Sequence, residues 1–170
     1  MTVSRWLTLL ILSLLVSGCG VLEHFVAAPD DSTPVSTEPP ALSMLRGDIA
    51  FAMDRGSFCW FTGERGICAD ALPPTYTADM HTLVIGTTLE LLFAEPAPDT
   101  VTAALHPGSN LMTREADLVA EAVLDANGRV LVTVPANLDG NYVLTLFATW
   151  SDERAAHGDA AYYAPIRFEQ

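Results

Sequence analysis

The side chains best suited to chemistry in this 170-residue chain are three cysteines and four histidines, and their spacing restricts what they can do. The histidines occur at four scattered positions: His24, His81, His106 and His157. A zinc site needs clustered histidines or further cysteines. A copper site built on Met112 and His157 lacks the late cysteine that it requires. We therefore expect no metal ion and no cofactor.

The patterns of nucleophilic and acid–base catalysis are also missing. No Gly-x-Ser-x-Gly nucleophile elbow occurs, and Ser109, which follows His106-Pro107-Gly108, reads as part of an ordinary loop. Among 21 acidic residues some carboxylates come close by chance, so their number is no sign of a hydrolase. The sequence predicts a protein without catalytic residues that is not an enzyme.

Cys19 lies in a setting that indicates lipid attachment. Met1–Arg5 is short and basic, and Trp6–Val16 is an apolar run about half as long as a bilayer-spanning helix, which is typical of an export signal. Val16-Ser17-Gly18-Cys19 resembles the lipobox of bacterial lipoproteins. The resemblance implies cleavage before Cys19, thioether-linked diacylglycerol and further acylation such as palmitate. The alternative is an ordinary secretory signal that ends in Gly-Cys.

This interpretation places the protein on the extracytoplasmic face of a cell membrane, and Gly20 permits sorting to an outer membrane if the cell has one. The whole chain has 21 acidic and 8 basic residues, a net charge of −13. Removal of residues 1–18 takes away Arg5, which leaves 7 against 21, or −14. Anionic lipid surfaces repel such a body, so the acyl chains alone must hold it. Nucleic acid is excluded as a partner because binding to phosphates needs a basic face.

With Cys19 lipidated, Cys59 and Cys68 remain as an even pair outside the cytoplasm, which favours a disulfide. The segment between them, with Thr62-Gly63-Glu64-Arg65-Gly66 at its centre, reads as a hairpin whose arms bring the two sulfurs together. The pair lacks the Cys-x-x-Cys spacing of redox enzymes. We predict a structural disulfide.

Three regions follow from composition. Residues 1–18 form the signal peptide, and residues 19–42 form a lipid-anchored start and a tether rich in Pro, Asp, Ser and Thr. Residues 43–170 form one domain, in which apolar positions recur mostly with a period of two. Expected strands are Gly47–Met53, Ser57–Phe61, Gly66–Ala69, Leu83–Ala94, Val101–His106, Leu118–Leu124, Arg129–Pro135, Asn141–Trp150 and Ala160–Phe168. Short strands between turn residues predict an all-β antiparallel sandwich.

Residues Thr113–Asp125 favour a helix about as well as a strand. Asn127-Gly128, which suits a type I′ hairpin turn, favours the strand Leu118–Leu124. Leu138-Asp139-Gly140-Asn141-Tyr142 resembles the tyrosine corner of Greek-key sandwiches.

A wider resemblance covers most of the domain. Its segments are Gly56-Ser57-Phe58-Cys59-Trp60, Cys68-Ala69-Asp70, Pro73-Pro74, Phe93 with Pro96 or Pro98, Gly140-Asn141-Tyr142, Trp150 and Tyr162-Tyr163-Ala164-Pro165-Ile166. Together they resemble the extracytoplasmic domain of a family of uncharacterised bacterial surface lipoproteins. The cysteine pair is a departure from the family or the trait of a subgroup. The resemblance implies an immunoglobulin-like fold and a location, and no activity.

Trp60, Asp70 and Trp150 are the candidate binding residues. Both tryptophans lie near strand ends, where exposed rings beside carboxylates suit recognition of an envelope protein or a glycan. The competing interpretation is that both indoles close the ends of the core.

These observations predict a membrane-anchored extracytoplasmic lipoprotein with a non-catalytic interaction or envelope-associated module. The alternatives are an accessory domain or hydrolase that acts on cell-wall or polysaccharide substrates, and a ligand-capturing lipoprotein associated with a transporter. A concave acidic cluster favours the hydrolase, and an exposed aromatic patch on one sheet favours the interaction module.

Overall fold

Eleven strands and no helix make up the part of the chain that the computed structural model describes, which is residues 36–77, 80–84, 86, 88–109, 111 and 118–169. The strands are β1 (Leu42–Arg46), β2 (Ile49–Ala52), β3 (Asp54–Thr62), β4 (Arg65–Ala69), β5 (His81–Val84), β6 (Thr88–Phe93), β7 (Thr100–Pro107), β8 (Leu118–Leu124), β9 (Arg129–Thr133), β10 (Gly140–Trp150) and β11 (Ala156–Glu169). The predicted all-β class is confirmed. Cys19 and residues 113–117 lie outside the described residues.

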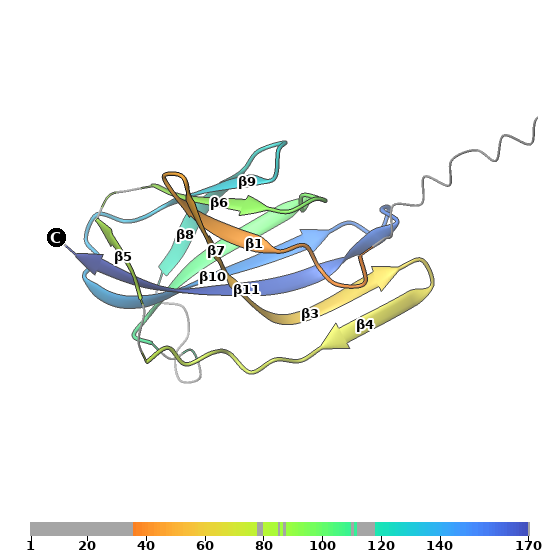
Figure 1. Ribbon diagram of the computed structural model, residues 1–170, viewed down its shortest axis with the longest axis horizontal. Coiled ribbons are helices and arrows are strands. Elements are labelled where there is room, and N and C mark those ends of the chain that lie inside the picture. Colours follow the sequence, from red (N-terminus) through yellow and green to blue (C-terminus); the bar gives the residue numbers. More distant parts are fainter. Residues whose placement is uncertain are drawn as a thin grey trace, which may run out of the picture. The chain divides into compact units, whose positions relative to one another are not determined.

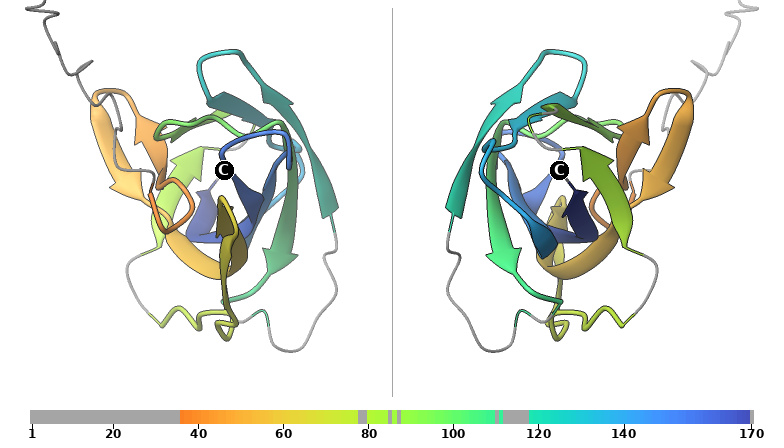
Figure 2. Two further views of the ribbon diagram at one scale, coloured as in Figure 1. Left: turned by 90° about the vertical axis from the view of Figure 1, so that its right-hand side faces the viewer. Right: turned by 90° about the vertical axis from the view of Figure 1, so that its left-hand side faces the viewer.

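The strands form one continuous hydrogen-bonded sheet in the order β2-β1-β6-β9-β8-β7-β10-β11-β3-β4. All neighbours on this path are antiparallel, as predicted, whereas β5 pairs with β11 in parallel. The sheet curls so strongly that its two halves face each other when it is viewed end-on (Figures 1 and 2). Strand β8 joins the halves because its first residues bond to β7 and its last residues bond to β9.

The core lies on the concave side of this curled sheet. In β10 the buried positions include Leu144, Leu146 and Ala148, which alternate with the partly or fully exposed Thr145 and Phe147. The same period of two in β6, β9 and β11 lines the interior with large apolar side chains. Successive side chains of a strand point to opposite faces, so the sequence pattern correctly identifies the core face.

The hairpin between β8 and β9 forms where Asn127-Gly128 predicts it. The Asp125 carboxylate (Oδ1) accepts hydrogen bonds from the backbone N–H groups of Asn127, at 2.8 Å, and Arg129, at 2.9 Å. These bonds lower the pKa of Asp125, because they stabilise its charged form. The strand interpretation of Leu118–Leu124 is thereby confirmed.

One expected strand is in fact two. The run Leu83–Ala94 covers the last two residues of β5 and all of β6. Strand β5 pairs with β11, whereas β6 pairs with β1 and β9. Gly86, whose φ is +77°, lies between the two strands, and the hydrogen-bond partners cannot be seen in a local pattern. Strand β11 also begins at Ala156 instead of Ala160, because it extends to follow β3.

The end of the expected tether belongs to the folded part. Pro39 and Pro40 are buried, and Leu42, the last residue assigned to the tether, begins β1. The Arg55 guanidinium donates to the Pro39 carbonyl at 2.9 Å, and the Tyr162 hydroxyl donates to the Pro40 carbonyl at 2.5 Å. Proline is common in linkers, but its ring is apolar and its carbonyl accepts hydrogen bonds, so this stretch packs against the sheet.

Candidate functional site

Both candidate tryptophans are buried, so neither ring is exposed at the surface. Trp60 is 1% exposed and Trp150 is 3% exposed, and their rings meet edge to face with centroids 5.1 Å apart. The Trp60 indole N–H donates to the Ser36 carbonyl at 3.0 Å, and that of Trp150 donates to the Pro96 carbonyl at 2.9 Å. Each polar tip is therefore satisfied inside the fold, as the competing core interpretation requires.

Gly158 lies between these two residues in the sheet. It pairs with Trp60 of β3 on one side and with Trp150 of β10 on the other. The backbone of β3 passes close to this glycine on the side where a side chain would lie. The Gly158 φ of +138° is unusual for other residues, and a Cβ atom there would lie 2.0 Å from the Cys59 carbonyl oxygen.

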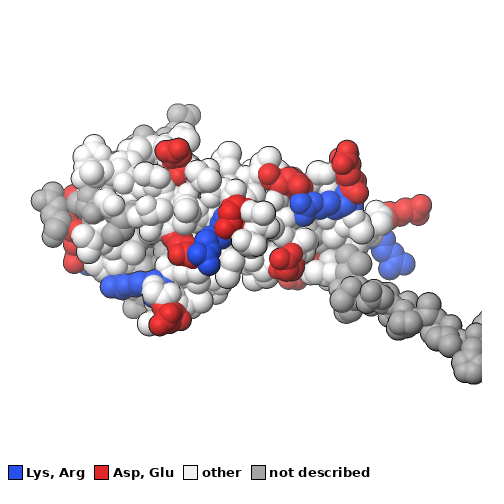
Figure 3. Space-filling model, turned by 90° about the horizontal axis from the view of Figure 1, so that it is seen from above, with Lys and Arg blue, Asp and Glu red and all other residues white. Residues whose placement is uncertain are grey.

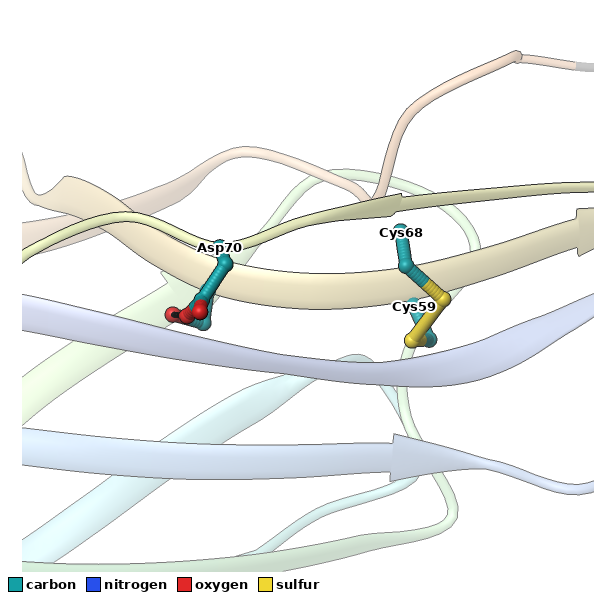
Figure 4. The surroundings of a disulfide bond; sticks show 4 residues. Cys59, Cys68 and Asp70 are labelled. Carbon is teal, nitrogen blue, oxygen red and sulfur yellow. Dashed lines mark hydrogen bonds between the residues drawn. A yellow bond between two sulfur atoms is a disulfide. The ribbon is translucent and has the colours of Figure 1, made fainter.

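Cys59 and Cys68 lie directly opposite each other on β3 and β4, with their sulfurs at the disulfide distance of 2.06 Å (Figure 4). The expected hairpin is formed, with the turn at Gly63-Glu64. Four of the five residues of β4 are exposed. The cysteine pair therefore joins the outermost strand of the sheet to β3.

Asp70 is exposed and follows the disulfide along the chain (Figure 4). The Ser57 hydroxyl donates to the Asp70 carboxylate at 3.0 Å and accepts from the Ala71 N–H at 3.0 Å. This candidate binding residue thus holds the chain after β4 against β3. The structure does not bring it together with either tryptophan ring, because both rings lie on the concave side.

The segment that begins at Asp70 is held at a second point by Tyr76. Its hydroxyl donates to the Asp54 carboxylate at 2.8 Å, and its N–H donates to the Ser109 carbonyl at 2.9 Å. Burial, followed by the hydrogen bond to Asp54, raises the pKa of Tyr76 well above its usual value. These bonds position Pro73 over the convex face of the sheet.

A groove of about 540 Å³, which we call the outer groove, lies beside Pro73 on this convex face. Strands β7, β8, β10 and β11 supply most of its lining, which includes Ala104, Val119, Thr145, Phe147, Ala161 and Tyr163. Val119 is 81% exposed and Phe147 is 45% exposed. Large apolar side chains open to solvent and gathered in one hollow are the usual mark of a binding surface.

The outer groove has no acidic, lysine or arginine side chain among its described lining residues. The Thr145 hydroxyl lies 3.1 Å from His106 Nε2 and donates a hydrogen bond to the Ala104 carbonyl. These polar groups of the lining therefore bond to one another. Burial raises the pKa of Tyr163, which keeps its hydroxyl protonated. The lining therefore favours uncharged, apolar groups.

A second, smaller pocket of about 310 Å³ lies elsewhere on the described surface and includes Arg46 and Glu90 in its lining. Among the described residues no group of three or more His, Cys, Asp and Glu is arranged to hold a metal ion, and no helix is long and apolar enough to cross a membrane. Acidic and basic side chains are interspersed on the face that Figure 3 shows, without a basic patch.

The sequence does not single out Val119 or Phe147. A detectable signal exists, since β10 carries Val143 and Phe147 on the face opposite Leu144, Leu146 and Ala148, so it is apolar on both sides. Such a strand is covered on its second face or presents that face to a ligand. No protein-family model, curated protein or solved structure matches the chain.

Proposed function

We propose that this protein is a lipid-anchored extracytoplasmic lipoprotein whose domain binds another protein of the cell envelope without catalysis. The lipobox-like Val16-Ser17-Gly18-Cys19 supports the anchor and the location, and the resemblance to bacterial surface lipoproteins agrees with both. Membrane lipid is then a partner only through the acyl chains on Cys19.

The proposal includes an immunoglobulin-like form of the sheet. Strands β7, β8 and β9 are consecutive neighbours, and β10 returns to lie beside β7, which gives the spatial order β10-β7-β8-β9. This order is that of a Greek key. It supports a sandwich in which β8 passes from one layer to the other.

The exposed apolar lining of the outer groove carries the functional proposal. Val119 and Phe147 are open to water, with exposed fractions of 81% and 45%. Burying such side chains against a partner contributes about 25 cal/mol for each Å² removed from water. The lining, which has no acidic, lysine or arginine side chain among its described residues, favours apolar side chains of a protein over a glycan, which needs many hydrogen-bonding groups.

The openness of the groove favours a protein over a small molecule. Pockets for small ligands cover most of the surface of the ligand, whereas Val119 at 81% exposure lies at an open margin. The surface of a partner protein around its contact residues excludes water from such a margin. We therefore assign the groove to an apolar surface segment of a partner protein.

Site-specific photo-crosslinking in cells tests this function. A benzophenone derivative of phenylalanine in place of Phe147 should yield one discrete protein adduct. Val119→Asp places a charge in the groove and should abolish the adduct, whereas Val123→Asp, on the same strand but outside the groove lining, should preserve it. Both valines are exposed, so neither change should unfold the domain.

No protein adduct, or an adduct that is insensitive to Val119→Asp, would refute the proposal. If the purified protein instead binds the amphiphilic, anionic dye anilinonaphthalene sulfonate at this groove and forms no protein adduct, the groove is a small-ligand site.

A further inference from the structure

Strand β4 remains on the sheet although it buries almost nothing. It is the last strand of the sheet order and pairs with β3 alone. Only Ala69 is partly buried, and Ile67 is 51% exposed. Burial therefore contributes little to holding β4 in place. The backbone ladder and the Cys59–Cys68 link hold it instead.

The outer edge of β4 presents free backbone groups at defined positions. The Cα atoms of Cys59 and Cys68 are 4.1 Å apart, which is the spacing of a non-hydrogen-bonded antiparallel pair. In such a pair the N–H and C=O groups point away from the partner strand. Cys68 and Gly66, two residues before it, therefore direct their N–H and C=O groups outward, while Ile67 bonds to β3.

This edge lacks several of the features that block pairing with another strand. Natural edges are protected by short length, charged side chains, proline, a bulge or a covering segment. Strand β4 is five residues long and has Arg65 as its one charged residue, but it contains neither proline nor lysine, and its register with β3 has no shift. The following residues turn away to Ser57. Within the described residues nothing pairs with this edge, which lies at the margin of the molecule in Figure 1.

A second copy of the chain does not suit the edge. Antiparallel self-pairing centred on Ile67 matches Gly66 with Cys68 of the second copy. The same register places Glu64 opposite Asp70 at both ends, and like charges directly opposite destabilise a sheet. Each copy also carries a net charge of −13, which adds a general repulsion.

We propose that the free edge of β4 binds an extended segment of a partner protein as an additional strand. Such strand addition uses backbone hydrogen bonds for affinity and alternate side chains for specificity. An apolar residue of the segment packs beside Ile67, and basic residues near the two ends of the segment approach the carboxylates of Glu64 and Asp70, which lie just beyond the ends of β4. The edge is separate from the outer groove, so either proposal can fail without the other.

Two synthetic peptides test the inference on the purified, disulfide-intact domain. The first has the sequence Lys-Thr-Thr-Val-Thr-Thr-Lys, and the matched control has Glu in place of both Lys. On binding, the Lys peptide should slow the hydrogen exchange of the Gly66 and Cys68 amides by on the order of tenfold, because only these β4 amides gain a partner. The Glu peptide should bind about fivefold more weakly at low salt.

Variants separate strand addition from non-specific attraction. Ile67→Lys puts a charge at the centre of the edge and should abolish the protection, whereas Leu72→Lys, at an exposed position outside β4, should leave it unchanged. Photo-crosslinking at Phe147 should be the same in both variants, since the outer groove is not altered. Equal binding of the two peptides, or no protection at Gly66 and Cys68, would overturn the inference.

Discussion

Single residues decide whether the aromatic end of the core can form. Gly158 pairs with both Trp60 and Trp150, and a Cβ atom there would clash with the Cys59 carbonyl. Gly56 has a similar role on the convex face, because a Cβ atom there would lie 2.3 Å from the Tyr163 ring. The segment Gly56-Ser57-Phe58-Cys59-Trp60 thus combines a close contact on one face with a buried indole on the other.

Replacement of Gly158 by alanine should destabilise the domain by about 3 kcal/mol, because it adds backbone strain and a clash with the Cys59 carbonyl. Gly47→Ala is the control: its φ of +60° is also positive, but nothing lies near the added methyl group, so about 1–2 kcal/mol is expected. Urea unfolding followed by circular dichroism measures both. Equal losses would show that the contact with Cys59 does not matter.

Trp60→Ala should lower the free energy of unfolding by about 3–5 kcal/mol, as expected when a large buried ring is removed. Phe61→Ala, at the next position on the exposed face, should cost far less, because the Phe61 ring stacks on His157 at the surface. Denaturant titration of both variants is the measurement. A Trp60→Ala protein of unchanged stability would contradict a core role.

At the scale of elements, some strand pairs are hairpins formed by residues close in sequence, and others join strands that are far apart in the chain. The β8–β9 turn is closed by the Asp125 carboxylate, and the β3–β4 hairpin is closed by a disulfide. Both are formed by residues close in sequence. By contrast, the place of β5 beside β11 depends on residues more than eighty positions apart.

The Asp125 turn makes stability depend on pH. Its pKa is lowered below 3.8 in the folded protein by the backbone N–H groups of Arg129 and Asn127. The stabilisation is therefore complete above the pKa of the unfolded chain and is lost as the pH falls through the folded value. Urea midpoints of the wild type and Asp125→Ala should differ at about pH 7 and converge near about pH 2.

Asp152→Ala is the control for this effect, since its carboxylate makes no hydrogen bond with the described residues. It should shift the midpoint little at any pH. A difference between the wild type and Asp125→Ala that stays constant from neutral to acid pH would exclude the charged carboxylate as its cause.

At the scale of the whole molecule, the proposed anchor and the acidic body have separate tasks. The proposed mature chain, without residues 1–18, has a net charge of −14, which anionic lipid repels. The outer groove and the β4 edge are both formed by the described residues. The proposed attachment therefore depends on Cys19 alone.

Cys19→Ala should release the protein from the membrane fraction into the soluble extracytoplasmic fraction, because two or three acyl chains are needed for stable anchoring. Fractionation with mass spectrometry of the N-terminal peptide tests this outcome. Cys68→Ser serves as the control, since it removes a cysteine without touching the lipobox. A Cys19→Ala protein that stays on the membrane would exclude lipid anchoring.

The sequence by itself determined the all-β class, the β8–β9 hairpin, most strand positions and the pairing of Cys59 with Cys68. These features depend on neighbouring residues, whose alternation and turn types are visible in the chain. The tertiary structure alone decided that Trp60 and Trp150 are buried, that Leu83–Ala94 divides between two strands, and that Val119 and Phe147 share one groove. Those outcomes depend on which distant strands pair. A pattern with a period of two predicts the two faces of each strand, but it does not predict which residues cover either face.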